Sequence, residues 1–253
     1  MTVEKSNLKG NRNRFETEVI EHLHEALPDD VEITLLADRG FGDRKRYAHL
    51  DRLGWYYVIR FKAGTHVTNA KGERRTAKRW LYENGKARIL KGATVTGHKY
   101  DVGGIVLVHD KKMKEAWCLA VRLPKATASS AVKLYGKRFK TEETFRDTKD
   151  LRFGMGLSAS RTKSPKRRDR LLLIAAMAHL LRTLLGAACE RIGFDRRLKA
   201  NASRKRTHSL FTQGRDWYGR IPRMSDEDLA DLMAAFEQIV REQNVFLGIF
   251  GIV

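Results

Sequence analysis

Four polar residues of different chemistry, Tyr135, Arg138, Glu142 and Lys149, follow one another with the spacing Y-x2-R-x3-E-x6-K. Because a helix turns by about 100° per residue, their side chains fall within an arc of roughly 60° on one helical face. A carboxylate can bind a divalent cation, and a phenol, a guanidinium and an ammonium can bind phosphate oxygens. The stripe therefore predicts a helix face that holds a metal ion beside a phosphate backbone.

A solvated helix face is the simpler explanation of such a stripe. Arg138 and Glu142 lie four residues apart and could pair with each other, but an exposed pair contributes only a few tenths of a kcal/mol, roughly. Apolar residues border the stripe on both flanks: Leu134 and Phe145 on one, Val132 and Phe139 on the other. These borders favour the floor of a groove over a fully solvated face.

Asp38 is the second candidate metal-binding carboxylate. It ends the apolar segment VEITLLAD (31–38), which predicts a short buried strand, and it begins the turn D-R-G-F. Ligands and metals gather at the carboxyl ends of strands in α/β sheets. An aspartate in this position can also simply cap the next turn. Together, Asp38 and Glu142 would offer the oxygen ligands that a hard cation such as Mg²⁺ prefers.

The elements that must position these residues follow from local patterns. Amphipathic helices are predicted over 12–27 and 43–53, and WYYVIRFK (55–62) predicts a second strand. Strand, helix and strand in this order are typical of an α/β sheet. The pair Asn84-Gly85 predicts a hairpin turn in the segment that follows.

The rest of the chain divides into a β-rich and a helical part. Segments 104–109 and 116–121 predict a further hairpin, and helices are predicted over about 129–150, 167–191 and 225–243. Ser225, followed by three acidic residues, is a plausible cap of the last helix. The helix over 129–150 carries the polar stripe.

Charge indicates the class of partner. The chain of 253 residues has 50 basic and 30 acidic residues and a net charge of +20, which attracts polyanions, most commonly nucleic acid. Two dense basic runs occur, one at 204–206 and one made of Lys163, Lys166, Arg167, Arg168 and Arg170. We expect them to contact phosphates and to make binding weaken steeply with salt.

A membrane is not an expected partner. There is no lipidation signal, and His179 and Arg182 interrupt the longest apolar segment, 171–189, which predicts a buried helix. The cysteines, Cys118 and Cys189, lie in apolar surroundings and are expected to be reduced core thiols of a cytoplasmic protein. No zinc-binding spacing occurs.

Several motifs together resemble one known family. They are D-R-G-F at 38–41, L-G-W-Y at 53–56, the Y-R-E-K stripe within 135–149, and G-L-S-A-S-R-T-K-S at 156–164. In combination they resemble the IS-four family of bacterial cut-and-paste transposases, which are of the DDE type. The resemblance covers nearly the whole chain.

The resemblance implies an RNase H-like core in which three acids hold two Mg²⁺ ions. Asp38 matches the second acid and Glu142 the third. The signature residues that grip the transposon end match Tyr135, Arg138 and Lys149. Trp117 matches a tryptophan that stacks near the DNA hairpin formed during excision, although a strand tryptophan can equally belong to the core.

The implied activity is metal-dependent cleavage and strand transfer at insertion-sequence ends. Its partners would be double-stranded DNA, at transposon ends and at the target, and a second copy of the protein in a synaptic complex. Lys166, Arg167 and Arg168 would add phosphate contacts. The implied location is the bacterial cytoplasm, in association with the nucleoid.

The first acid of the family has no counterpart, because it lies on a strand upstream of D-R-G-F and the chain begins too late to contain it. Asp29 and Asp30 stand at the start of the strand that ends at Asp38, roughly 20 Å or more away along an extended segment. We therefore expect the C-terminal part of a transposase, either a natural truncation or an excerpt.

The expected fold class is α/β, with a partial RNase H-like core that lacks its N-terminal strands. The core occupies 1–63, a β-rich insertion 64–124, the core helix with the signature 125–165, and a helical region 166–253. Two-metal cleavage should then fail, and the strand at 31–38 should be left with an unpaired edge.

Two other functions stay open. One is a non-catalytic basic DNA-binding protein, including an inhibitor that forms inactive complexes with intact transposase. The other is a nuclease of the same fold with different substrates, which Tyr135, Arg138 and Lys149 make the weaker alternative.

Overall fold

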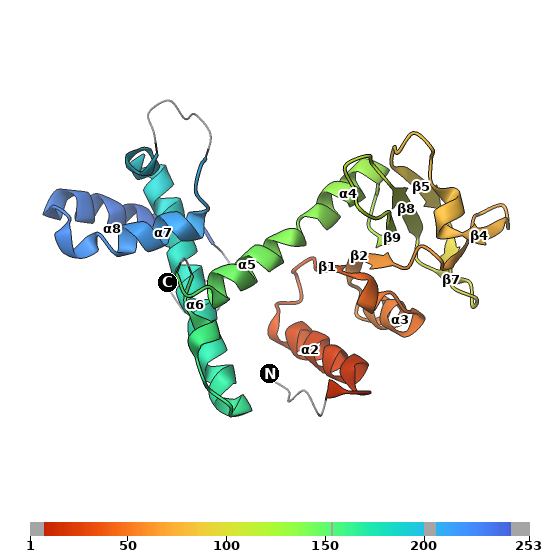
Figure 1. The fold of residues 1–253 in the computed structure, drawn as a ribbon, viewed down its shortest axis with the longest axis horizontal. Coiled ribbons are helices and arrows are strands. Elements are labelled where there is room, and N and C mark those ends of the chain that lie inside the picture. The colour runs from red at the N-terminus through yellow and green to blue at the C-terminus, as the bar shows by residue number, and fades with distance from the viewer. Residues whose placement is uncertain (1–7, 153, 200–205, 244–253) are drawn as a thin grey trace. The chain divides into compact units, whose positions relative to one another are not determined.

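The structure, a computed structural model, describes residues 8–152, 154–199 and 206–243. The chain forms two compact units (Figure 1). We call Gly10–Thr144 the sheet unit and Phe145–Val253, with Met1–Lys9, the helical unit. The combination of two sheets with helices makes the fold mixed α/β.

The main sheet of the sheet unit has five strands in the order β1-β2-β9-β8-β5. Their bounds are β1 Thr34–Ala37, β2 Tyr56–Phe61, β5 Arg88–Lys91, β8 Gly104–Val108 and β9 Trp117–Arg122. β1 and β2 are parallel and the other pairs are antiparallel. The segment 64–124 therefore contributes β5, β8 and β9 to the same sheet as β1 and β2. In the described part of the chain β1 pairs with β2 alone, so its other edge is open.

A smaller sheet has the order β4-β3-β6-β7. Its strands are β3 His66–Thr68, β4 Arg74–Thr76, β6 Thr94–Val95 and β7 Tyr100–Asp101, and a 3-10 helix, η2, covers Ala77–Trp80. Gly85 has a φ of +74°, as a turn after Asn84 requires. The hairpin predicted there is wrong, however, because β4 pairs with β3 whereas β5 pairs with β8.

Alternating side chains of β2 enter two apolar clusters, as the period of a strand dictates. Tyr57 and Ile59 join the cluster that also contains Tyr47 and Leu50 of α3 (Arg44–Arg52). Val58 joins a second cluster under α4 (Ala128–Gly136). The N-terminal helix α2 spans Arg12–Ala26. The main sheet thus positions both α3 and α4.

The stripe residues do not share one continuous helix, so the prediction of a single helix over 129–150 is wrong. α4 ends at Gly136 and α5 spans Phe139–Lys149. Between them the hydrogen bonds shorten to i→i+3, from Lys137 N to Leu134 O at 3.0 Å and from Arg138 N to Tyr135 O at 3.0 Å. Such bonds tighten a turn to about three residues, and glycine is a poor helix former. The tight turn therefore separates α4 from α5.

The helical unit is built on α6 (Pro165–Arg191), α7 (Leu210–Tyr218) and α8 (Asp226–Arg241). Short 3-10 helices lie at Leu157–Ala159, Phe194–Leu198 and Ile221–Arg223. Its core contains these buried residues: Leu185, Ala188, Cys189, Phe194, Trp217, Leu232, Ala235 and Ile239. Ser225 Oγ accepts the Asp228 N–H at 3.2 Å, which confirms the predicted cap of α8.

α6 is buried only in part. Its end from Leu185 onward enters the core, but Leu172, Leu173, Ile174, Met177 and Leu181 are exposed, so the prediction of a buried helix fails for most of 172–181. By length and composition alone, α6 is the one helix of the described chain that could cross a membrane. One such helix is weak evidence of membrane insertion, because core helices pass the same test.

Both cysteines are free and buried, as predicted for core thiols. Burial raises the pKa of the Cys118 thiol to about 11 and that of the Cys189 thiol to about 12. Both side chains are therefore protonated at neutral pH.

Candidate functional site

Asp38 directly follows β1 and begins the 3-10 helix η1 (Arg39–Phe41). Its Oδ1 accepts the Arg39 N–H at 2.7 Å, so it caps this turn. The turn lies tightly on β2, because a Cβ on Gly42 would be 2.9 Å from both Arg60 O and Phe61 Cβ. β1 and β2 therefore hold the Asp38 carboxylate at the end of the sheet.

Three further side chains converge on this carboxylate. Tyr135 Oη donates a hydrogen bond to Asp38 Oδ1 at 3.4 Å, and Arg60 Nη1 lies 3.9 Å from the same oxygen. Partial burial raises the pKa of Asp38, but the Arg39 N–H and the charges of Arg138 and Arg60 outweigh it and lower the pKa overall. Asp38 is therefore an anionic acceptor at neutral pH.

Arg138 pairs with Glu142 and acts electrostatically on Asp38. Its Nη2 lies 3.2 Å from Glu142 Oε1, and its charge also lowers the pKa of Asp38. The Glu142 side chain is 63% exposed and that of Asp38 is 45% exposed. The charge of one guanidinium therefore acts on both predicted acids, and both remain open to solvent.

Aromatic rings form one wall of the site. Trp117, at the start of β9, contacts the Tyr135 ring edge-on with centroids 4.9 Å apart and stacks on Phe139 with centroids 5.8 Å apart. The Arg138 guanidinium lies over the Phe139 ring at 4.8 Å. Phe139 is 41% exposed, so this wall presents an aromatic face to solvent.

The environment of Tyr135 differs more from the sequence-based prediction than that of the other site residues. The whole residue is buried, in the cluster with Val58, Val106 and Leu119, and its hydroxyl faces Asp38. Burial raises the pKa of Tyr135, and the Asp38 charge raises it further. Its direct contact with phosphate stays a prediction, whereas its packing role is evident.

Three residues of the site were not singled out from the sequence. Glu115 Oε2 lies 2.6 Å from Arg60 Nη2 and 3.4 Å from Arg39 Nη1. The parallel register, in which Ala37 pairs with Ile59, could have placed Arg60 beside Asp38. No local signal marked Glu115, because its approach depends on how β9 pairs with β2.

The remaining predicted DNA-binding residues, Lys149, Lys166, Arg167 and Arg168, belong to the helical unit. Lys149 Nζ lies 5.4 Å from the Phe145 ring centroid, and Arg168 Nη2 donates to Thr162 O at 2.9 Å. Of the second basic run, Arg206 pairs with Glu190, and positions 204 and 205 lie outside the described residues. The site around Asp38 is built from the sheet unit alone.

The chemistry of the two predicted acids can be compared with what a cation shared with a ligand requires. Among the described residues, no three His, Cys, Asp or Glu side chains are grouped to hold a metal. Mg²⁺, however, is commonly bound by one or two protein carboxylates together with waters and substrate phosphates. Asp38 and Glu142 are carboxylates of the type that such a site uses, and their joint binding of a cation stays a prediction.

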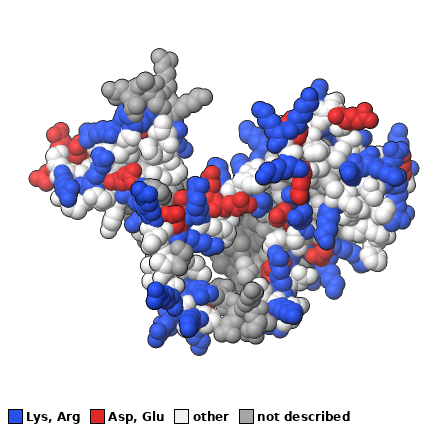
Figure 2. Space-filling model, in the orientation of Figure 1, with Lys and Arg blue, Asp and Glu red and all other residues white. Residues whose placement is uncertain are grey.

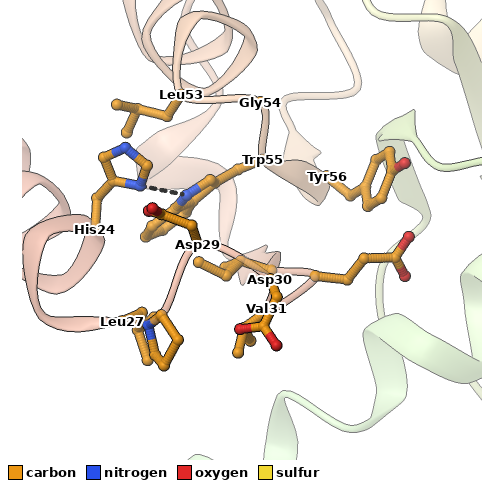
Figure 3. Close-up of a pocket in the computed structure, with 12 residues that line it drawn as sticks. His24, Leu27, Asp29, Asp30, Val31, Leu53, Gly54, Trp55 and Tyr56 are labelled. Carbon is orange, nitrogen blue, oxygen red and sulfur yellow. Dashed lines mark hydrogen bonds between the residues drawn. The ribbon is translucent and has the colours of Figure 1, made fainter.

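Asp29 and Asp30 line a different feature, a cavity of about 250 Å³ at the N-terminal end of β1. There Trp55 Nε1 donates to His24 Nδ1 at 3.3 Å (Figure 3). These aspartates precede β1 whereas Asp38 follows it, which agrees with the expectation that they do not replace a missing acid.

Basic side chains cover much of the face drawn in Figure 2, over the sheets as well as the helices. The charge of +20 is therefore spread over both units, and it is not confined to the two basic runs.

A family model described as "Transposase DDE domain" matches residues 6–181, which is well over half of the chain. The match includes the whole sheet unit and extends into α6. A comparison with curated proteins gives no match.

Proposed function

The chain belongs to the transposase DDE domain family, and from this premise we propose that its sheet unit binds DNA with a backbone phosphate at Asp38, Arg138 and Glu142. Such a family implies DNA as a partner and generally uses a divalent metal. We further propose that the chain is of the IS-four type with the Y-R-E-K signature, and that its main sheet is part of an RNase H-like core.

One observation carries the proposal. Arg138 Nη2 is 3.2 Å from Glu142 Oε1, and the charge of Arg138 helps to lower the pKa of Asp38, so one guanidinium interacts electrostatically with both solvent-accessible carboxylates. Opposite charges that meet at the end of a strand are what a phosphate and a metal ion would require together. An isolated exposed ion pair would not explain why both acids come to the same arginine.

Asp38 and Glu142 would hold the Mg²⁺ ion. When bound, this ion would stabilise the charge that develops on the phosphate and would lower the pKa of a bound water. Tyr135 orients the Asp38 carboxylate through its hydrogen bond. Arg138 would exchange Glu142 for phosphate oxygens, which its planar fork can bind in pairs. Trp117 and Phe139 would offer their rings to an unstacked base.

We propose that this chain alone does not cleave DNA. Two-metal phosphoryl transfer clamps both the attacking and the leaving oxygen between two ions. In the described part of the chain, Asp38 and Glu142 have no third His, Cys, Asp or Glu grouped with them. Assembly as a dimer on two DNA ends, and action at the bacterial nucleoid, belong to the same proposal.

The test is binding of a fluorescein-labelled duplex of mixed sequence, followed by anisotropy over a range of salt concentrations. We expect Arg138→Ala to lower affinity and to reduce the salt slope by about 1. Arg14→Ala is the matched control, because Arg14 pairs with Glu18 at the same i,i+4 spacing and 3.2 Å distance in the sheet unit. Equal losses in the two variants, or no loss in Arg138→Ala, would refute the proposal.

A non-catalytic DNA-binding protein is the second candidate, and the net charge of +20 favours it. Glu142→Ala separates the two through the Mg²⁺ dependence of DNA binding. If Asp38 and Glu142 hold the ion beside a phosphate, Mg²⁺ should strengthen binding by the unaltered chain and not by Glu142→Ala, whereas a mere DNA-binding protein should show no such difference. Cleavage by the unaltered chain would contradict both the second candidate and the proposed lack of activity.

A further inference from the structure

The Glu115 carboxylate lies between two arginines of the sheet unit. Its Oε2 is 2.6 Å from Arg60 Nη2 and 3.4 Å from Arg39 Nη1. One oxygen atom thereby faces two guanidinium groups. Arginine side chains surround a phosphate oxygen in the same manner, because their planar donors match carboxylates and phosphates alike.

The three side chains differ in how firmly they are held. Arg60 is only 15% exposed, and its Nη2 also donates to Ala116 O at 3.2 Å. Arg39 and Glu115 are 55% and 58% exposed. Arg60 is therefore fixed in place, whereas Glu115 is bound from the solvent side. Another anion can replace an exposed carboxylate at little cost, since exposed ion pairs contribute little.

This pair of arginines adjoins the proposed phosphate position. Arg60 reaches toward Asp38 with Nη1, at 3.9 Å from Oδ1, and toward Glu115 with Nη2. Arg39 is the residue next to Asp38 in the chain. A DNA strand whose phosphate lies at Asp38 would bring a neighbouring phosphate within reach of Arg39 and Arg60.

We propose that Arg39 and Arg60 form a second phosphate subsite, that Glu115 occupies it in the DNA-free protein, and that a DNA phosphate displaces Glu115. The proposal rests on the function proposed above and adds a competitor within the chain. Glu115 neutralises part of the basic surface until a polyanion with several simultaneous contacts arrives. A small anion can bind only at this one subsite, so it competes poorly with Glu115.

If the role of Glu115 is purely structural, its replacement should change DNA affinity in the opposite direction. If its role were to hold Arg39 and Arg60 in their binding positions, its neutralisation would release both side chains and weaken DNA binding. If it competes with phosphate, neutralisation strengthens binding. The sign of the change in affinity therefore separates the two roles.

The experiment compares Glu115→Gln with Glu83→Gln, which removes the same charge from an exposed glutamate of the same unit outside this cluster. Binding of the labelled mixed-sequence duplex is followed by anisotropy at about 0.1 M salt, where screening is moderate. We expect Glu115→Gln to lower the Kd by about 2- to 5-fold beyond the effect of Glu83→Gln. In an Arg39→Ala background this extra gain should largely disappear.

Equal affinities for Glu115→Gln and Glu83→Gln, or weaker binding by Glu115→Gln, would overturn the inference. If Arg138→Ala still loses affinity in that case, the proposed function stands and only the subsite fails. If the unaltered protein shows no salt-dependent DNA binding, both proposals fall together. Matching thermal midpoints of the variants would exclude a folding defect as the cause.

Discussion

The hydroxyl of Tyr135 donates a 3.4 Å hydrogen bond to Oδ1 of Asp38, and this contact joins residues 97 positions apart in the chain. The tyrosine residue is buried among apolar residues of β2, β8 and β9, whereas Asp38 is partly open to solvent. The contact therefore anchors a partly exposed carboxylate to the interior of the sheet unit.

Replacing Tyr135 separates the hydrogen bond from the packing. Tyr135→Phe should lower the free energy of unfolding by about 0.5–1.5 kcal/mol, because it removes one donor, and Tyr135→Ala by about 3–5 kcal/mol, because it leaves a cavity. Urea unfolding measures both. The pKa of Asp38 should rise in Tyr135→Phe, as seen by NMR titration of its carboxyl carbon. An unchanged pKa would mean that the hydroxyl does not act on Asp38.

The lowered pKa of Asp38 predicts how the site depends on pH. The stabilisation from this charge is fully present above the unfolded-state pKa, near 3.9, and is lost as the pH falls through the lower folded-state value. Asp38→Asn should therefore be less stable than the unaltered protein at pH 7, with the difference shrinking below about pH 4. Thermal midpoints between pH 7 and 3 measure this difference. A constant or growing difference in acid would contradict it.

Two glycines let α6 and α7 approach closely in the helical unit. A Cβ on Gly214 would lie 1.7 Å from Arg182 O, and one on Gly186 would lie 1.9 Å from Leu210 O. Gly214→Ala and Gly186→Ala should each destabilise the unit by about 1–3 kcal/mol or more, since packed backbone must move. Urea unfolding followed by circular dichroism measures the change.

Gly219→Ala serves as the control for these two variants. Gly219 has ordinary helical geometry, with a φ of −66°, and a Cβ there would meet no heavy atom closer than 3.7 Å. We expect no loss of stability, or a gain of up to about 1 kcal/mol from a less flexible unfolded chain. If Gly219→Ala destabilised the protein as much as Gly214→Ala, close helix contact would not be the cause.

The open edge of β1 predicts self-association. Within the described residues β1 pairs only with β2, and unpaired strand edges promote pairing with other chains. Size-exclusion chromatography with light scattering should show mass rising with concentration. Thr34→Lys, which adds a charge to the first residue of β1, should shift the distribution toward monomer. A monomer at all concentrations would argue against a reactive edge.

Several local elements of this protein could be predicted from its sequence. The apolar segments 31–38 and 55–62 contain β1 and β2 as predicted, and the serine cap located the start of α8. The type and spacing of Asp38, Arg138 and Glu142 marked the candidate site. These features depend on neighbours within a few residues, so hydrogen bonding and side-chain periodicity express them directly.

How these strands and helices pack together could be seen only in the tertiary structure. The pairing of β9 with β2 brings Glu115 and Trp117 to the Asp38 end of the sheet. Tyr135 is buried beside Trp117, and a tight turn after Gly136 divides the predicted single helix. Strand order and burial follow from contacts between distant segments, because the free energy of packing is gained only when those segments meet.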